Sequence, residues 1–112
     1  MNSAQRKRLA LAGSGLAMLA LPLSSIAADE AADLFKSKCA MCHGLDGAGK
    51  TLMGEKLKIP ALQSADVQKK SDADFKTVIS KGKDKMPAYE TKLSKEQIEK
   101  LVACIRDLAK KQ

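Results

Sequence analysis

The sequence predicts a small all-α protein, and three observations support this fold class. Residues 94 to 109 begin with a capping box, and apolar side chains recur after it at the spacing of one helix face. A second stretch begins at the natural N-cap Ser71 and ends at Gly82. No segment of useful length alternates apolar and polar residues, which is the pattern of a half-buried strand.

The first 27 residues have the pattern of a cleavable secretory signal. Basic residues at 6–8 precede a charge-free run at 9–21, and small residues lead up to Ala27. This run of 13 residues stops at a proline and is shorter than the roughly 20 residues that span a bilayer, so we expect cleavage rather than a membrane anchor. The sequence predicts a signal peptide at 1–27 and one exported, periplasmic domain at 28–112.

Charge and composition limit what this domain can do. The whole chain has 112 residues, a formal charge of +7 and 3% aromatic residues. The predicted signal contains three basic residues and no acids, so its removal lowers the charge to +4. This modest excess without interleaved aromatic residues argues against nucleic-acid binding. With so little aromatic bulk, we expect a non-protein group to complete the core.

We expect three helices and two loops in the mature domain. The first helix has acids at its start and places Leu34 and Phe35 at helical spacing. The first loop contains four glycines and one short helical turn. The expected helices cover 29–39, 71–82 and 94–109, and the loops cover 44–60, with a turn near 52–57, and 82–87.

The chemistry is concentrated in the run Cys39-Ala40-Met41-Cys42-His43. This is C-x-x-C-H, the attachment signature for c-type haem. Two thiols at this spacing can reach the two vinyl groups on one side of a porphyrin, and the next residue, His43, then lies under the iron. The imidazole needs an acceptor that orients its ring. We therefore expect one haem c, bound through Cys39 and Cys42.

Three other interpretations of this motif fit less well. A redox C-x-x-C favours a thioredoxin-like βαβ context, which a strandless chain lacks. A zinc site could recruit Cys104, but it gives the glycine-rich loops no role. A disulfide between Cys39 and Cys42 leaves His43 without a purpose.

The second axial ligand is expected to be a methionine, because His43 is the only histidine in the chain. Met86 lies in a glycine-opened loop and is followed by Pro87, which stiffens the backbone. Met53 is only ten residues from His43 and is expected to pack against the haem edge. We expect Met86 to be the ligand. A thioether raises the reduction potential, and two filled axial positions suit a carrier of single electrons.

These motifs together resemble the class I cytochrome c family. The matching segments are CAMCHGLDGAGK, then Pro60-Ala61-Leu62, then GKDKMPAY, then LSKEQIEKLVACIRDL. The resemblance implies crossed N- and C-terminal helices around a haem crevice, with Phe35 at the crossing. It also implies that the carbonyl of Pro60 accepts a hydrogen bond from the proximal imidazole and that Leu62 packs on the haem.

Cys104 departs from the family pattern, which commonly has an aromatic residue at this point of the last helix. Its neighbours Leu101 and Leu108 favour a small apolar role at the core boundary. The alternative is a disulfide that links two chains in an oxidising compartment. We expect a monomer and retain a dimer linked through Cys104 as the alternative.

The function expected from these features is electron transfer without conversion of a substrate, so the protein is not expected to be an enzyme. Lysines near Cys39 and Met86 would steer it to redox partners such as a bc-type complex, an oxidase, a photosystem or a reductase. The interspersed acids leave a generic solvated face as the other interpretation. The alternative function is a haem-based sensor or weak peroxidase in which Met86 dissociates.

Overall fold

The computed structural model describes residues 13, 15 and 23–111. Within this part of the chain the fold is helical without a β-strand, and the only β feature is an isolated bridge between Lys83 and Met86. The predicted all-α class is therefore confirmed. The helices are α1 (Leu23–Lys38), α2 (Ala40–His43), α3 (Leu52–Lys56), α4 (Ala65–Gln68), α5 (Asp72–Lys81) and α6 (Lys95–Lys110).

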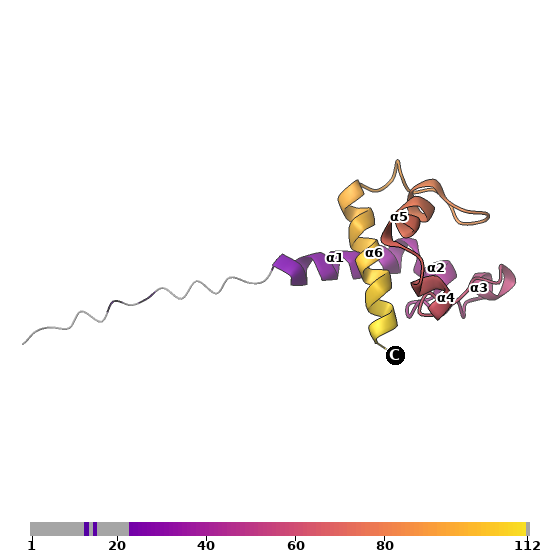
Figure 1. The fold of residues 1–112 in the computed structure, drawn as a ribbon, viewed down its shortest axis with the longest axis horizontal. Coiled ribbons are helices and arrows are strands. Elements are labelled where there is room, and N and C mark those ends of the chain that lie inside the picture. Colours follow the sequence, from indigo (N-terminus) through magenta and orange to yellow (C-terminus); the bar gives the residue numbers. More distant parts are fainter. Residues whose placement is uncertain (1–12, 14, 16–22, 112) are drawn as a thin grey trace, which may run out of the picture.

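The first and last helices cross, as predicted, and form the most extensively packed pair in the fold (Figure 1). Phe35 of α1 is buried at this crossing, and Leu101 of α6 is the most deeply buried large side chain. The apolar face expected for α6 is buried, and α5 packs beside it. We refer to the following residues as the core cluster: Phe35, Val67, Phe75, Ile79, Leu93, Ile98, Leu101, Val102 and Ile105.

The caps predicted for the two later helices are present. The side chain of Ser71 accepts from the backbone of Asp74, and that of Ser94 accepts from the backbone of Gln97. Both serines complete reciprocal capping boxes, because the side chain at the third helical position bonds back to the serine backbone. These local contacts fix where α5 and α6 begin.

The first helix begins earlier than the sequence pattern suggested. It starts at Leu23 instead of Asp29, and so it runs across the predicted cleavage point after Ala27. Alanines at 27 and 28 favour this extension because alanine has the highest helix propensity. Most of the predicted signal, at 1–12, 14 and 16–22, lies outside the described residues. Among the helices that are described, none has the length and apolar character needed to cross a bilayer.

The segment between α2 and α5 contains the expected turn and one helix that was not expected. The turn near 52–57 is α3, capped by Thr51. The additional helix, α4, spans only four residues and is capped by Ser64. A helix this short has no apolar periodicity to detect, which explains why the sequence pattern did not predict it. Together these two turns give the segment between α2 and α5 a fixed course.

Candidate functional site

The C-x-x-C-H motif lies at a break between α1 and α2. Cys39 interrupts the helical path, and the amides of Cys42 and His43 both donate to its carbonyl oxygen, at 3.3 Å and 3.0 Å. Gly44 then ends α2 with a φ of 83°, a conformation that favours glycine. One tight turn thus brings the two thiols and the imidazole together at the end of α1.

The state of the thiols argues against a redox-active pair. All three cysteines are free, and burial raises the pKa of the Cys39 thiol to about 11, with smaller contributions from Cys104 and Cys42. A nucleophilic C-x-x-C cysteine needs the opposite, a lowered pKa. The zinc alternative also lacks support, since no cluster of three or more potential metal ligands occurs among the described residues.

His43 has the properties of a neutral ligand. Burial lowers the pKa of its imidazole, which favours the uncharged ring that offers a lone pair to a metal. Its Nδ1 atom is buried and makes no hydrogen bond with any described residue. The Pro60 carbonyl therefore does not form the expected bond here, and its role beside bound haem stays a prediction. An unpaired buried nitrogen next to two free thiols fits a site built for a further group.

Two glycines set the close packing on the proximal side, the side of His43. Gly49 has a φ of 71° and donates from its amide to the His43 carbonyl at 2.7 Å. A Cβ atom there would lie 2.6 Å from the carbonyl oxygen of Ile59, so glycine allows the segment before Pro60 to approach. At Gly54 of α3, a Cβ atom would lie 2.7 Å from the carbonyl oxygen of Cys42.

The hydroxyl of Thr51 completes this docking of α3. It donates to the carbonyl oxygen of Cys42 at 2.7 Å and accepts from the amide of Gly54 at 2.8 Å. One side chain therefore caps α3 and bonds it to the tight turn at residues 39–44, which we call the attachment turn. The sequence pattern predicted the turn but not this contact, although a threonine before a short helical turn was the available signal.

The two candidate methionines differ in how they pack. Gly82, with a φ of 77°, opens its loop, and Met86 and Lys83 exchange backbone hydrogen bonds of 2.8 Å and 3.1 Å. The Met86 side chain packs against the core cluster, as does Cys39. Met53 on α3 is 38% exposed and does not belong to that packing.

We call residues 44–72 the proximal loop. Leu62 lies where this loop approaches α6. Its amide donates to the Gly47 carbonyl at 2.8 Å, and its side chain packs against the core cluster. A Cβ atom at Gly47 would touch both Leu62 and Leu108 of α6, so this approach also depends on glycine. Packing of Leu62 against haem remains a prediction, but its attachment to the proximal loop is observed.

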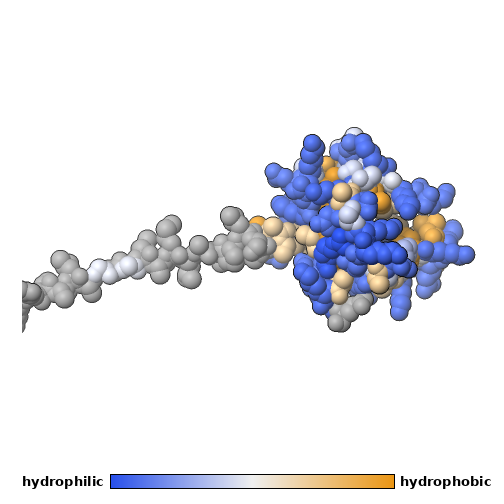
Figure 2. All heavy atoms as spheres, in the orientation of Figure 1, coloured by the Kyte–Doolittle hydropathy of each residue, from blue (hydrophilic) through white to orange (hydrophobic). Residues whose placement is uncertain are grey.

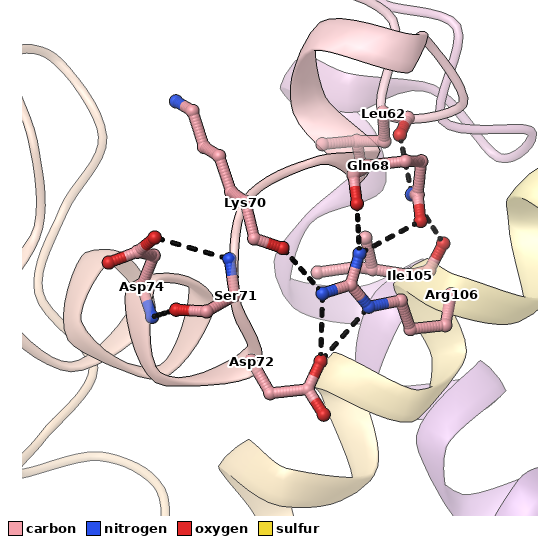
Figure 3. Close-up of polar contacts among 8 residues, drawn as sticks. All are labelled: Leu62, Gln68, Lys70, Ser71, Asp72, Asp74, Ile105 and Arg106. Carbon is pink, nitrogen blue, oxygen red and sulfur yellow. Dashed lines mark hydrogen bonds and ion pairs between the residues drawn. The ribbon is translucent and has the colours of Figure 1, made fainter.

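A polar cluster centred on Arg106 holds this loop on α6 (Figure 3). The guanidinium donates to the carbonyl oxygens of Gln68 and Lys70, at 2.7 Å and 2.6 Å, and pairs with Asp72. It also lies over the ring of Phe75, 4.3 Å from the centroid. The Gln68 side chain in turn donates to the carbonyl of Leu62 at 2.8 Å. We call this set of contacts the Arg106 clamp.

Cys104 occupies the boundary position expected of a small apolar residue. It is half-buried and packs against the core cluster. Burial is the largest cause of the raised pKa of its thiol, followed by the negative charge of Asp107. A raised pKa lowers the thiolate fraction and hence the reactivity of the thiol. A dimer linked through Cys104 stays an untested prediction.

We call residues 82–89 the Met86 loop. The surface around this loop is basic, but part of its charge is neutralised by acids. Lys36, Lys38, Lys83 and Lys85 are exposed. Lys81 is paired with Glu90, with a distance of 2.8 Å between the ammonium and a carboxylate oxygen. The visible face of the protein is mainly hydrophilic, and apolar surface appears at the end where α3 lies, consistent with the 85% exposure of Leu52 (Figure 2).

Comparisons with known proteins agree with the chemistry of this site. The family model described as cytochrome C oxidase, cbb3-type, subunit III matches residues 26–105. Cytochrome c6 of Nostoc sp. strain PCC 7120 is 32% identical over 102 residues, which cover 87% of this chain and 86% of that protein. The solved structure of the KustC0563 c-type cytochrome is similar with a TM-score of 0.65 and 31% identity, covering 70% of this chain and 95% of the other.

Proposed function

Because this chain belongs to the class I cytochrome c family, and is therefore a c-type haem electron carrier, we propose that it is an exported monohaem carrier with His43 and Met86 as axial ligands. Cys39 and Cys42 hold the haem by thioether bonds. When bound, haem c supplies an iron that gains and loses one electron. The neutral imidazole of His43 and the thioether of Met86 are the donor atoms that this chain offers to it.

The observation that carries the ligand assignment is the packing of Met86. Its side chain lies against the same core cluster as Cys39, whereas Met53 is exposed on α3 and Met41 is 80% exposed within the attachment motif. The Lys83–Met86 bridge closes the backbone of the loop that carries this thioether. This arrangement suits electron transfer, which needs ligands that rearrange little.

The test is the holoprotein variant Met86→Ala, with Met53→Ala as the matched control. We expect Met86→Ala to lower the reduction potential by on the order of 0.1 V, because a lost thioether no longer favours ferrous iron. The ferrous variant should also bind carbon monoxide. Met53→Ala should leave the potential and the carbon monoxide reaction unchanged. If Met53→Ala has these effects and Met86→Ala does not, the assignment is wrong.

The same spectra separate the carrier from a sensor or weak peroxidase. A carrier with a firm methionine ligand shows the methionine-to-iron charge-transfer band in its ferric wild-type form at neutral pH. A sensor or peroxidase with a displaceable ligand shows no such band in its wild-type form at neutral pH. A persistent band therefore favours the carrier.

Export with cleavage after Ala27 is compatible with the packing of α1. Ile26 is 62% exposed, and the first buried side chain among the described residues of α1 is Ala31. Removal of residues 1–27 therefore leaves the packed part of the helix intact. We expect mass spectrometry of the periplasmic holoprotein to give the mass of residues 28–112 plus one haem. A mass that includes residues 1–27 would contradict cleavage.

We propose that the partners are redox proteins or membrane complexes with an acidic docking surface, such as a bc-type complex, an oxidase, a photosystem or a reductase. Exposed lysines at 36 and 38 lie at the end of α1, and those at 83 and 85 lie in the Met86 loop. Opposite charge on a partner raises the encounter rate, and salt screens it. Reduction by an acidic partner should slow about tenfold between roughly 0.01 M and 1 M ionic strength. Reduction by a neutral dye serves as the control, and an equal response of both reactions argues for a generic lysine surface.

A further inference from the structure

The break between α1 and α2 frees a backbone carbonyl beside the haem-attachment motif. In a continuous helix, the amide of Cys42 would donate to the carbonyl of Lys38. Here it donates instead to the carbonyl of Cys39. The hydroxyl of Tyr89 donates to the Lys38 carbonyl at 3.0 Å. A residue 51 positions away in sequence therefore caps the end of α1, directly before Cys39.

Tyr89 is also fixed at the base of the Met86 loop. Its amide donates to the carbonyl of Ile79 in α5 at 2.9 Å, and its carbonyl accepts from the amide of Leu93 at 2.9 Å. Its ring is half-buried and packs against the core cluster. The side chain and backbone of Tyr89 therefore link the end of α1 to α5, the helix that leads into the loop.

The Met86 loop itself is closed mainly by local contacts. The amide and carbonyl of Met86 both bond to Lys83, so these two hydrogen bonds link one part of the loop to another. Pro87 follows and has no amide hydrogen to donate. Two residues further along the chain, Tyr89 provides a direct bond from the end of this loop to the helix that leads into Cys39.

We propose that Tyr89 is a positioning residue that holds the Met86 loop against the haem-attachment end of α1. The inference rests on the proposed function, in which Met86 is an axial ligand. The hydroxyl of Tyr89 restrains the excursions that carry Met86 away from the iron, and so it slows replacement of the thioether by an external ligand. Its contact with Lys38 sets how readily Met86 is displaced, while the ring supports the core.

The test is the holoprotein variant Tyr89→Phe, which keeps the ring and removes only the hydroxyl. The binding rate of imidazole to the ferric protein, followed in the visible spectrum, should rise about fivefold, the factor that corresponds to one net hydrogen bond. The matched control is Ser37→Ala. The Ser37 hydroxyl donates to the Leu34 carbonyl at 3.3 Å, a hydrogen bond that lies within the same end of α1. Its imidazole rate should equal that of the wild type.

A failure of the Tyr89 proposal and a failure of Met86 as the axial ligand give different results. If wild type shows the methionine-to-iron band and Tyr89→Phe binds imidazole at the wild-type rate, Tyr89 does not position Met86, and the ligand assignment stands. If Ser37→Ala accelerates binding as much as Tyr89→Phe, the effect is a general loosening of α1, and the proposal is overturned. If wild type lacks the band and Met86→Ala leaves the imidazole rate unchanged, the ligand assignment and the inference both fail.

Discussion

The two sides of the candidate haem site are held in different ways. On the proximal side, residues 44–72 are bonded to the attachment turn through Gly49 and Thr51, and the Arg106 clamp ties their far end to α6 (Figure 3). On the distal side, the backbone of the loop from Gly82 to Tyr89 bonds largely to itself, and the hydroxyl of Tyr89 makes the hydrogen bond that joins the loop to α1. From this difference we expect that, in the proposed haem site, His43 is held more firmly than Met86.

The close backbone packing of the proximal side predicts the largest effect. We expect Gly54→Ala to lower the free energy of unfolding of the holoprotein by about 3 kcal/mol, because overpacking against backbone atoms leaves little room to relax. The added Cβ atom would lie 2.7 Å from the Cys42 carbonyl oxygen and closer still to that of Gly49. Guanidinium denaturation measures the change.

The matched control lies on the same short helix. Leu52 is 85% exposed, so Leu52→Ala should change the free energy of unfolding by less than about 0.5 kcal/mol. If Gly54→Ala is as stable as Leu52→Ala, then α3 is not wedged against the attachment turn, and the proximal side is less constrained than the distances indicate.

The sequence predicted the features that are local along the chain. The capping boxes at Ser71 and Ser94 depend on residues three positions apart, and the apolar spacing of α6 repeats within one helix. Both patterns can therefore be recognised from the sequence alone. The attachment motif is equally local, because Cys39, Cys42 and His43 fall within one turn.

Polar contacts between residues far apart in the sequence were not predicted. Arg106 meets Gln68 across 38 positions, and Tyr89 meets Lys38 across 51. Sequence periodicity indicates which helix face is apolar, but not which carbonyl a polar side chain reaches. In addition, the carbonyl of Lys38 is free for Tyr89 only because the helix breaks at Cys39, and the motif by itself does not reveal that break.

A smaller effect is expected from the Arg106 clamp, and it tests whether the two sides are independent. Arg106→Leu leaves the carbonyls of Gln68 and Lys70 without their charged donor, so we expect the holoprotein to lose about 2 kcal/mol of unfolding free energy. Arg106→Lys should recover only part of this loss, because an ammonium lacks the planar fork that bonds several acceptors at once.

Imidazole binding by the Arg106 variants tests whether the proximal and distal sides are independent. The clamp lies on the proximal side, so Arg106→Leu should bind imidazole at the wild-type rate even though its denaturation midpoint falls. Tyr89→Phe should show a different pattern, with faster binding and a loss of about 1 kcal/mol in unfolding free energy, smaller than that of Arg106→Leu, since it removes one hydrogen bond. Faster imidazole binding in Arg106→Leu would mean that loosening the proximal loop also releases Met86. The two sides would then respond as one unit, and the separate roles of clamp and hydroxyl would have to be abandoned.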